Sequence, residues 1–154
     1  MPRCPPLPLQ ALVKQVLGDY NPPTGRTAPN LDAGHHPLQV RADSDKLQQA
    51  LLNVVSNAYK YSPKTGAVRI KVAMQRVSGQ PPAGCMDVVD QGIGKTPEQR
   101  ARVCERFYRA DTSGKTLGTG LGMSIVKEIV ALHQGALEID SVVGEGTAVR
   151  VFLP

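Results

Sequence analysis

The sequence contains no tryptophan, and its four tyrosines and two phenylalanines make up only 4% of the 154 residues. The core must therefore be built mainly from aliphatic side chains, which suits a layered α/β domain. So few aromatic rings also leave little with which to stack on bases. Lysine and arginine are scattered rather than gathered into a stripe, so the net charge of +5 does not indicate nucleic-acid binding. A basic surface for a polyanionic small ligand or an acidic partner explains the charge equally well.

Cysteine is also scarce. Cys4, Cys85 and Cys104 are odd in number, far apart and without a CxxC spacing, so neither a disulfide framework nor a zinc site is indicated. No run approaches the roughly eighteen apolar residues that cross a bilayer, and the first residues lack the apolar segment of a signal peptide. We expect a soluble domain in a reducing cytosol. The proline-rich start is typical of a linker entered from a longer protein.

The length suits one domain with a full hydrophobic core and is too short for two domains of ordinary size. Apolar residues at helical spacing predict helices over residues 7–20, from 43 or 44 to a stop at 63, and over 121–133. Alternating or short apolar runs predict strands at 30–33, 38–41, 67–77, 85–90, 136–139 and 148–153. We expect the first two strands to flank a turn, and the next two to form a hairpin. The strand at 67–77 should bury Val68, Ile70, Val72 and Met74.

The second predicted helix has an unusual polar face. Gln49, Asn53, Asn57 and Lys60 fall on one stripe at about 100° per residue. Asparagine is a poor residue for a helix interior, because its amide competes for the backbone. A solvated face is the alternative, although such faces are usually built from other polar residues. We interpret the amide oxygen of Asn57, and with it that of Asn53, as a ligand of Mg²⁺, with Lys60 near phosphate charge.

A second candidate element ends the predicted strand at 85–90. Asp90 is its last residue, and Gly92 and Gly94 follow. A carboxylate in this position can accept a hydrogen bond from an exocyclic amine, while the glycines let the backbone pass close to a flat ring. Taken alone, the stretch is equally compatible with an ordinary turn, because Asp-x-Gly is common in turns.

The stretch SGKTLGTGLGMSIVKEIV, residues 113–130, combines two phosphate-binding patterns. A P-loop needs G-x-x-x-x-G-K-[ST], but counting back from Gly114 places Arg109 where the first glycine must stand. The G-x-G-x-x-G pattern of a dinucleotide site also fails, because Met123 takes the last glycine position. What remains is a glycine-rich entry at 118–122 into a helix, whose exposed N–H groups can bind an anion.

Together these motifs resemble the ATP-binding catalytic domain of bacterial sensor histidine kinases, within the GHKL family that includes gyrase and MutL ATPases. LQQALLNVVSNAYKYSP looks like the family's N-box, DQGIG like its first glycine box, ERFYRAD like its F-box, GTGLGMSIVKEIV like its second glycine box, and VGEGTAVRVFLP like its closing segment. The likeness covers residues 43–154. It implies a Bergerat fold, an α/β two-layer sandwich in which a mixed, mostly antiparallel sheet packs on three helices under a mobile ATP lid at about 92–119.

The resemblance also implies the nucleotide contacts. Asn57 and Asn53 would hold Mg²⁺, and Lys60 would lie near the phosphates. Arg106 and Arg109 would contact the γ-phosphate and offset charge during phosphoryl transfer. The remaining nucleotide-binding residues would be Tyr61 along the adenine, Asp90 on its amine, Gly92, Ile93 and Gly94 beside the base, Lys115 in the lid, Gly118, Thr119, Gly120, Leu121 and Gly122 at the phosphates, and Thr147 at the pocket floor.

The chain departs from the family pattern in three places. The F-box usually has an aromatic residue where Cys104 stands, which leaves Phe107 to anchor the lid alone. Lys95 and Thr96 follow the first glycine box in place of an apolar residue and proline. Gln134 stands where a glycine often follows the helix-ending histidine. Because none of these changes removes an expected ligand, they bear on the lid more than on nucleotide binding.

The activity that the resemblance implies is transfer of the γ-phosphoryl group of Mg-ATP to a histidine on a separate dimerisation and phosphoacceptor domain. No histidine of this chain resembles that phosphoacceptor. His35 and His36 precede Pro37 in a turn-like segment, and His133 ends a helix as a packing or capping residue. Residues 1–24 are expected to be a linker and lead-in helix from the missing domain, and residues 25–154 the catalytic domain.

Further expectations concern the parent protein. It would be a homodimer anchored in the bacterial inner membrane, with this domain cytoplasmic and monomeric when isolated, and a response regulator as downstream partner. Two other functions remain open. One is a degenerate nucleotide-binding module without phosphotransfer. The other is an ATPase like the gyrase relatives, although Gln49 lies about where those enzymes carry a catalytic glutamate, and an amide is no general base.

Overall fold

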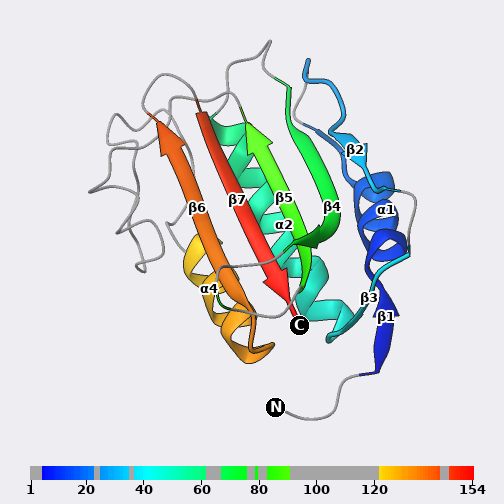
Figure 1. Cartoon of the computed structure of the whole chain (residues 1–154). Helices are drawn as coiled ribbons and strands as arrows, with labels where there is room; N and C mark the ends of the chain where they lie inside the picture. The colour runs from blue at the N-terminus through cyan, green and yellow to red at the C-terminus, as the bar shows by residue number, and fades with distance from the viewer. Residues whose placement is uncertain are drawn as a thin grey trace.

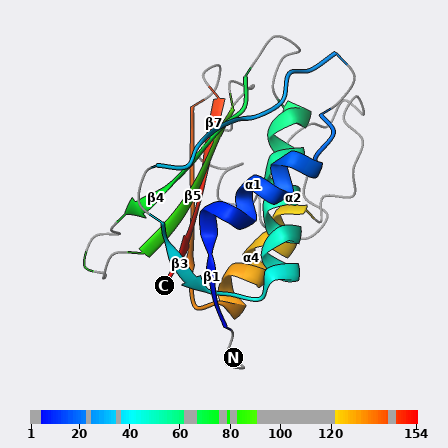
Figure 2. The same ribbon diagram turned by 90° about the vertical axis from the view of Figure 1, so that its right-hand side faces the viewer.

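The computed structural model describes residues 5–22, 25–34, 37–61, 67–75, 79, 83–90, 122–142 and 146–154. The described helices are α1 (Leu9–Asp19), α2 (Ser44–Tyr61) and α4 (Gly122–Leu132). The described strands are β1 (Pro6–Pro8), β2 (Asn30–Asp32), β3 (Gln39–Arg41), β4 (Arg69–Gln75), β5 (Ala83–Asp90), β6 (Ala136–Val142) and β7 (Gly146–Leu153). They form two layers, with the sheet on one side and the helices on the other (Figures 1 and 2).

In the described part of the chain, the main sheet has five strands in the order β2-β4-β5-β7-β6. β2 runs parallel to β4, and every other neighbouring pair is antiparallel. The expected hairpin of β4 and β5 is present, as is the closing hairpin of β6 and β7. The predicted fold class, a mixed and mostly antiparallel sheet backed by helices, is confirmed.

The hydrophobic core lies between the helices and one face of this sheet. Because successive residues of a strand point to opposite faces, β4, β5 and β7 each present every second side chain to the helices. The core residues from these strands are Ile70, Val72, Met86, Val88, Val149, Val151 and Leu153, and those from the helices include Leu9, Val13, Leu47, Leu51, Val55 and Val126. The helix α1 therefore shares one core with the rest of the described chain.

The start of α2 is fixed by its capping residue. Asp43 Oδ1 accepts hydrogen bonds from the backbone N–H groups of Asp45, at 3.0 Å, and Lys46, at 3.1 Å. These N–H groups belong to the first turn, where no carbonyl of the helix can reach them. The prediction that Asp43 or Ser44 caps this helix is confirmed for Asp43, and the helix that it begins carries Asn53, Asn57 and Lys60.

The two short strands predicted at 30–33 and 38–41 are present as β2 and β3, and each pairs with a different strand: β2 with β4, and β3 with β1. Two predictions about the fold are wrong in detail. Residues 7 and 8, expected in the first helix, belong to β1, which places Leu7 opposite Val40 of β3. Met74, expected on the buried face, is 52% exposed. Local periodicity predicts whether a segment is a helix or a strand. It does not predict which strand will pair with it, or which of its residues the helices will bury.

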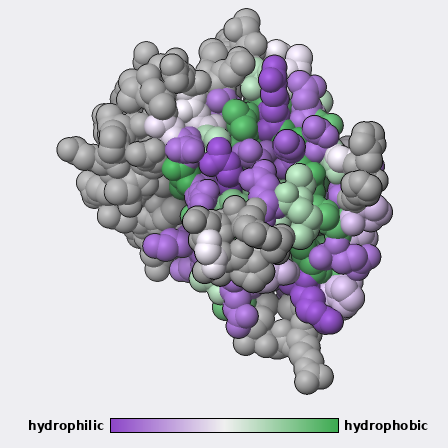
Figure 3. Space-filling model, in the orientation of Figure 1, coloured by the Kyte–Doolittle hydropathy of each residue, from purple (hydrophilic) through white to green (hydrophobic). Residues whose placement is uncertain are grey.

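The sheet face that points away from the helices is charged, and it is largely hydrophilic where its described residues are visible (Figure 3). Arg150 of β7 lies among three carboxylates, with nitrogen–oxygen distances of 3.6 Å to Asp87, 3.8 Å to Glu138 and 3.2 Å to Asp140. Asp87 also lies opposite Lys71 of β4. This arrangement is typical of a solvated sheet face stabilised by cross-strand pairs.

Candidate functional site

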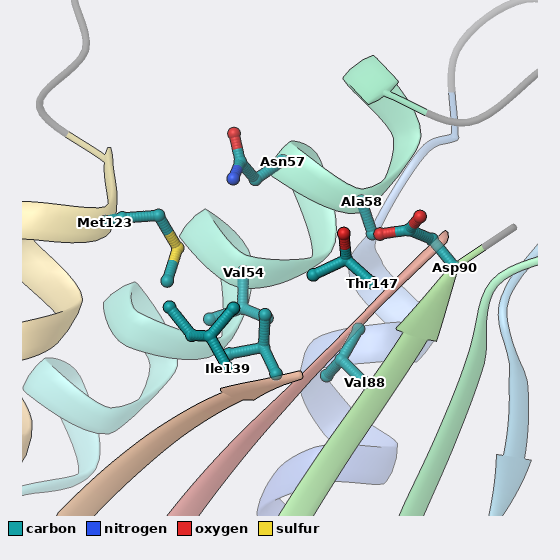
Figure 4. Close-up of a pocket in the computed structure, with 9 residues that line it drawn as sticks. Val54, Asn57, Ala58, Val88, Asp90, Met123, Ile139 and Thr147 are labelled. Atoms are coloured by element: carbon teal, nitrogen blue, oxygen red, sulfur yellow. The ribbon is translucent and has the colours of Figure 1, made fainter. Parts of the chain in front are cut away.

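A pocket lies between α2, α4 and the helix-facing side of the sheet, at the end where β5 stops and β7 begins (Figure 4). Its walls are mostly aliphatic, with polar groups toward one end. The lining residues are Val54, Asn57, Ala58, Val88, Asp90, Met123, Ile139, Thr147 and Val149. A pocket of this composition suits a flat, largely apolar group that carries a few hydrogen-bonding atoms.

Asp90 and Thr147 form the polar end of the pocket. They are direct partners on β5 and β7, and both side chains are buried, with 7% and 5% exposed. Asp90 is the last residue of β5, so its carboxylate lies where the apolar strand ends. A buried carboxylate is an acceptor for an N–H donor of a bound molecule, and its position next to a hydroxyl provides a second polar contact.

A hydrogen-bonded chain orients the Thr147 hydroxyl. Ser141 Oγ donates to the backbone C=O of Gly146 at 3.0 Å and lies 2.8 Å from Thr147 Oγ1. Either of the two hydroxyls can donate to the other, and the contact fixes the position of the Thr147 oxygen at the pocket. Sequence reasoning missed Ser141, although its place opposite Thr147 across the closing hairpin could have indicated it.

Asn57 reaches the same pocket from the other layer. It extends from α2, while Asp90 and Thr147 reach in from the ends of β5 and β7 (Figure 4). Its side chain is half-buried, so one side is available to solvent or a ligand. Asn53, one turn earlier, is half-buried but is not among the lining residues, and Lys60 is exposed. Of the polar residues predicted for the site and described here, the pocket brings together Asn57, Asp90 and Thr147.

The entry to α4 borders the pocket from a third side. Gly122 is the first residue of this helix, and Met123 lines the pocket beside Ile139. The predicted site residues Gly92, Ile93, Gly94, Arg106, Arg109, Lys115, Gly118, Thr119, Gly120 and Leu121 lie outside the described residues, as do the predicted lid and the side chain of Tyr61.

The donor set bears on whether a metal could be held here. Within the described ranges, no group of three or more His, Cys, Asp or Glu side chains could hold a metal ion. Asp90 and Thr147 lie at the sheet side of the pocket, and from the helix side the described lining offers the amide oxygen of Asn57. One protein oxygen suits Mg²⁺ that takes most of its ligands from phosphate and water, and does not suit a metal held by protein alone. The residues present therefore fit a magnesium ion that enters with a phosphate ligand.

His133 is a structural residue, as predicted. It is 4% exposed, its Nδ1 lies 2.8 Å from the C=O of Ile129, and its Nε2 accepts a hydrogen bond from the N–H of Asp43 at 3.0 Å. His35 and His36 lie outside the described residues. No described helix is long and apolar enough to cross a membrane.

Comparison with known proteins gives one consistent result. A family model described as "Histidine kinase-, DNA gyrase B-, and HSP90-like ATPase" matches residues 42–154. The chain is 40% identical over 119 residues to the sensor histidine kinase WalK of Bacillus subtilis, which covers 76% of this chain and 19% of WalK. It is 41% identical over 120 residues to the histidine-protein kinase/phosphatase MprB of Mycolicibacterium smegmatis, which covers 75% of this chain and 24% of MprB.

Solved structures agree with the sequence relatives. A mycobacterial sensor histidine kinase MprB superposes with a TM-score of 0.79 and 32% identity over 98% of this chain and 97% of that one. Full-length ShkA in complex with AMPPNP gives a TM-score of 0.76 and 27% identity over 97% of this chain and 30% of ShkA. The chain spans between 14% and 25% of the length of the curated relatives it matches, so it corresponds to one part of those proteins.

Proposed function

Because the chain belongs to the family of histidine kinase-, DNA gyrase B- and HSP90-like ATPases, we propose that it binds Mg-ATP between α2 and α4 and transfers the γ-phosphoryl group to a histidine of a separate helical domain. The observation that carries this proposal is the meeting of Asn57, Asp90 and Thr147 on one pocket with aliphatic walls. Its aliphatic walls suit a flat base, and the amide of Asn57 suits a magnesium ion that accompanies phosphates.

The base half of the proposal rests on Asp90. Its buried carboxylate accepts a hydrogen bond from the exocyclic amine of adenine, and the oxygen of Thr147 accepts a second one, either from the base or from a water beside it. Val54, Ala58 and Ile139 contact the faces of the ring and exclude water from it. A guanine base carries a carbonyl oxygen in place of the amine, so it would bring an acceptor to an acceptor.

The phosphate half rests on α2 and on the entry to α4. Asn57 contributes one oxygen to magnesium, with Asn53 one turn earlier as a further contact through water, and Lys60 supplies a positive charge near the phosphates. The N–H groups at the start of α4, reached through Gly118, Thr119, Gly120, Leu121 and Gly122, bind phosphate oxygens. Arg106, Arg109 and Lys115 stabilise the charge that develops on the transferred group, since positioning and electrostatics dominate this chemistry. Tyr61, Gly92, Ile93 and Gly94 complete the surroundings of the base.

The proposal extends to the parent protein. Residues 1–24 would connect a dimerisation and phosphoacceptor domain to the catalytic domain at 25–154, with residues about 92–119 as the lid. The parent would be a membrane-anchored homodimer with this domain on the cytoplasmic side, and a response regulator would receive the phosphoryl group. The signalling role is supported by the relatives WalK, a sensor histidine kinase, PhoR, a phosphate regulon sensor protein, and MprB, a signal transduction histidine-protein kinase/phosphatase.

Two alternatives are less well supported. A degenerate nucleotide-binding module would be expected to have lost polar groups of the pocket, whereas Asn57, Asp90 and Thr147 all line it. ATP hydrolysis without phosphotransfer needs a general base for water. Gln49 has no basic group, and its side chain is exposed on α2.

The decisive experiment is titration of the whole chain with a fluorescent ATP analogue, with and without magnesium. We expect Asp90→Asn to abolish detectable binding, and Asn57→Ala to remove the effect of magnesium while leaving weak binding. Asp140→Asn is the matched control, because this carboxylate is largely exposed on β6 and should leave the affinity unchanged. If Asp90→Asn and Asn57→Ala both bind like wild type, the pocket assignment is wrong.

Phosphotransfer needs a second experiment. Incubated alone with radiolabelled Mg-ATP, the chain should take up little label. Label should appear on a dimerisation and phosphoacceptor domain from a related sensor kinase when that domain is added. Stable label on a histidine of the chain itself would contradict the proposed division of roles.

A further inference from the structure

The last four carbonyl groups of α2, at residues 58–61, have no N–H partner within the helix. For the C=O of Tyr59 the residue four positions later is Pro63, which has no N–H and so cannot be its donor. In the structure the guanidinium of Arg26 takes the place of that donor: its Nη1 donates to the C=O of Tyr59 at 3.1 Å. A side chain 33 positions earlier in the sequence therefore completes the last turn of the helix.

The side chain of Tyr59 is held by the same segment. It is 3% exposed, and its hydroxyl donates to the backbone C=O of Thr27 at 2.6 Å. The Arg26 guanidinium carbon also lies 5.0 Å from the centroid of the Tyr59 ring, within the range of a cation–π contact. Residues 26 and 27 thus contact both the backbone and the side chain of Tyr59.

Tyr20, the residue after the end of α1, packs on the same ring. The ring centroids of Tyr20 and Tyr59 are 5.8 Å apart, and the ring planes differ by 24°. Burial, and next the neighbouring Tyr20, raise the pKa of Tyr59, which Arg26 partly offsets. The Tyr59 hydroxyl therefore keeps its proton and remains a donor to Thr27. Arg26 and Tyr59 form what we call the α2 brace, on which the ring of Tyr20 stacks.

The brace holds the turn that carries the phosphate contacts. Asn57 and Lys60 lie within two residues of Tyr59 on α2, and Asn57 lines the pocket. Terminal helix turns fray when their carbonyls have no partner, and a displacement of about 1 Å at a reacting group can cost on the order of a hundredfold in rate. Arg26 and Tyr59 are not among the residues that line the pocket, so any effect they have on a ligand bound there is indirect.

We propose that Arg26 and Tyr59 are positioning residues for the nucleotide site, which fix the last turn of α2 so that Asn57 and Lys60 meet magnesium and the phosphates. This inference rests on the proposed function. The phosphate half of the ligand should depend on the last turn of α2 more than the base does. The base meets Asp90 and Thr147 on the sheet as well as Ala58 on α2, whereas magnesium and the phosphates meet α2 at Asn57 and Lys60.

The test compares Mg-ATP with adenosine, each displacing the fluorescent ATP analogue from the whole chain. Tyr59→Phe removes the hydroxyl and keeps the ring. It should weaken Mg-ATP binding about fivefold, the effect of one hydrogen bond, and adenosine binding by less. Tyr20→Phe is the matched control, because it also loses one hydroxyl while the stacked ring remains. It should bind both ligands like wild type.

Substitutions of Arg26 test the same proposal independently. Arg26→Ala should weaken Mg-ATP binding about tenfold and adenosine binding by less, and Arg26→Lys, which keeps a donor and a positive charge, should recover part of the loss. Circular dichroism and urea midpoints establish that each variant is folded. Equal losses for Mg-ATP and adenosine, or no loss in Tyr59→Phe and Arg26→Ala, would overturn the positioning role.

The same series separates the two proposals. If wild type binds Mg-ATP and Asp90→Asn abolishes binding, while the Arg26 and Tyr59 variants bind normally, the proposed function holds and the brace proposal fails. If wild type does not bind Mg-ATP, both proposals fail together.

Discussion

The backbone N–H of Asp43 donates a hydrogen bond to Nε2 of His133 over 3.0 Å, although the two residues lie 90 positions apart. The other ring nitrogen lies 2.8 Å from the C=O of Ile129, which can only accept, so Nδ1 carries the proton. The ring is thus a neutral bridge between the end of α4 and the residue that caps α2. With both nitrogens engaged and 4% of the residue exposed, His133 has no nitrogen available as a phosphoacceptor.

Replacing His133 by alanine should cost stability. The change leaves the Asp43 N–H without its partner and opens a cavity beside α4, so we expect the free energy of unfolding in urea to fall by about 3 kcal/mol. Lys127→Ala, at an exposed position on the same helix, is the control and should change it by less than about 0.5 kcal/mol. Equal effects of the two substitutions would contradict the bridging role.

The turn after α4 permits a stabilising substitution. Gln134 has a φ of 56°, a left-handed conformation that favours glycine, so Gln134→Gly should raise the free energy of unfolding by about 0.5–1 kcal/mol. Gly135 is the opposite case, since a Cβ there would lie 2.2 Å from the carbonyl oxygen of Phe152. Gly135→Ala should therefore lower the free energy of unfolding by more than about 2 kcal/mol. Urea titration of both variants checks the signs.

Asp87 should make the free energy of unfolding depend on pH in the acid range. Burial raises its pKa, and Arg150 and Lys71 offset this only in part. Its Oδ1 is buried without a hydrogen-bond partner among the described residues. A carboxyl group whose pKa is higher in the folded state adds stability below its unfolded pKa and loses that contribution as the pH rises through its folded pKa.

Asp87→Asn tests this response, because the amide stays neutral at every pH. The free energy of unfolding of wild type, relative to the variant, should increase as the pH falls from about 7 to about 3.5. Urea midpoints across that range measure the difference. A difference that is constant with pH, or that decreases toward acid, would show that burial does not dominate at Asp87.

Cys85 should resist modification while the protein is folded. It is fully buried, and burial raises its pKa to about 12, so only about one thiol in ten thousand is ionised at pH 8. We expect iodoacetamide to label Cys85 only in concentrations of urea that unfold the chain. Mass spectrometry of the Cys85 peptide follows the reaction, and labelling under native conditions at the rate of a free thiol would contradict the expectation.

The sequence was informative where chemistry is local. The capping residue Asp43, the apolar face of α2 and the carboxylate at the end of β5 follow from patterns a few residues long, and each is present as predicted. The amide of Asn57 was selected because asparagine is unfavourable within a helix, and it does line the pocket.

Relationships between distant segments could not be derived in this way. The pairing of β2 with β4, the position of Ser141 behind Thr147 and the contact of Arg26 with Tyr59 depend on tertiary packing, which periodicity does not encode. Asn53 is a further example. It lies on the same helix face as Asn57 but is not among the lining residues, because the sequence pattern does not indicate how far the pocket extends along the helix.

The order of the sheet has a consequence for the making of the protein. The strand that is synthesised last among those described, β7, lies between β5 and β6 rather than at an edge, and it carries Thr147 into the pocket. During synthesis on the ribosome, α2 and β5 emerge before β7, so the edge of β5 that pairs with β7 stays unpaired until β7 has been made. A nascent chain therefore lacks the part of the pocket that Thr147 and Val149 form, and under the proposed function a product that terminates before β7 is not stabilised by ATP.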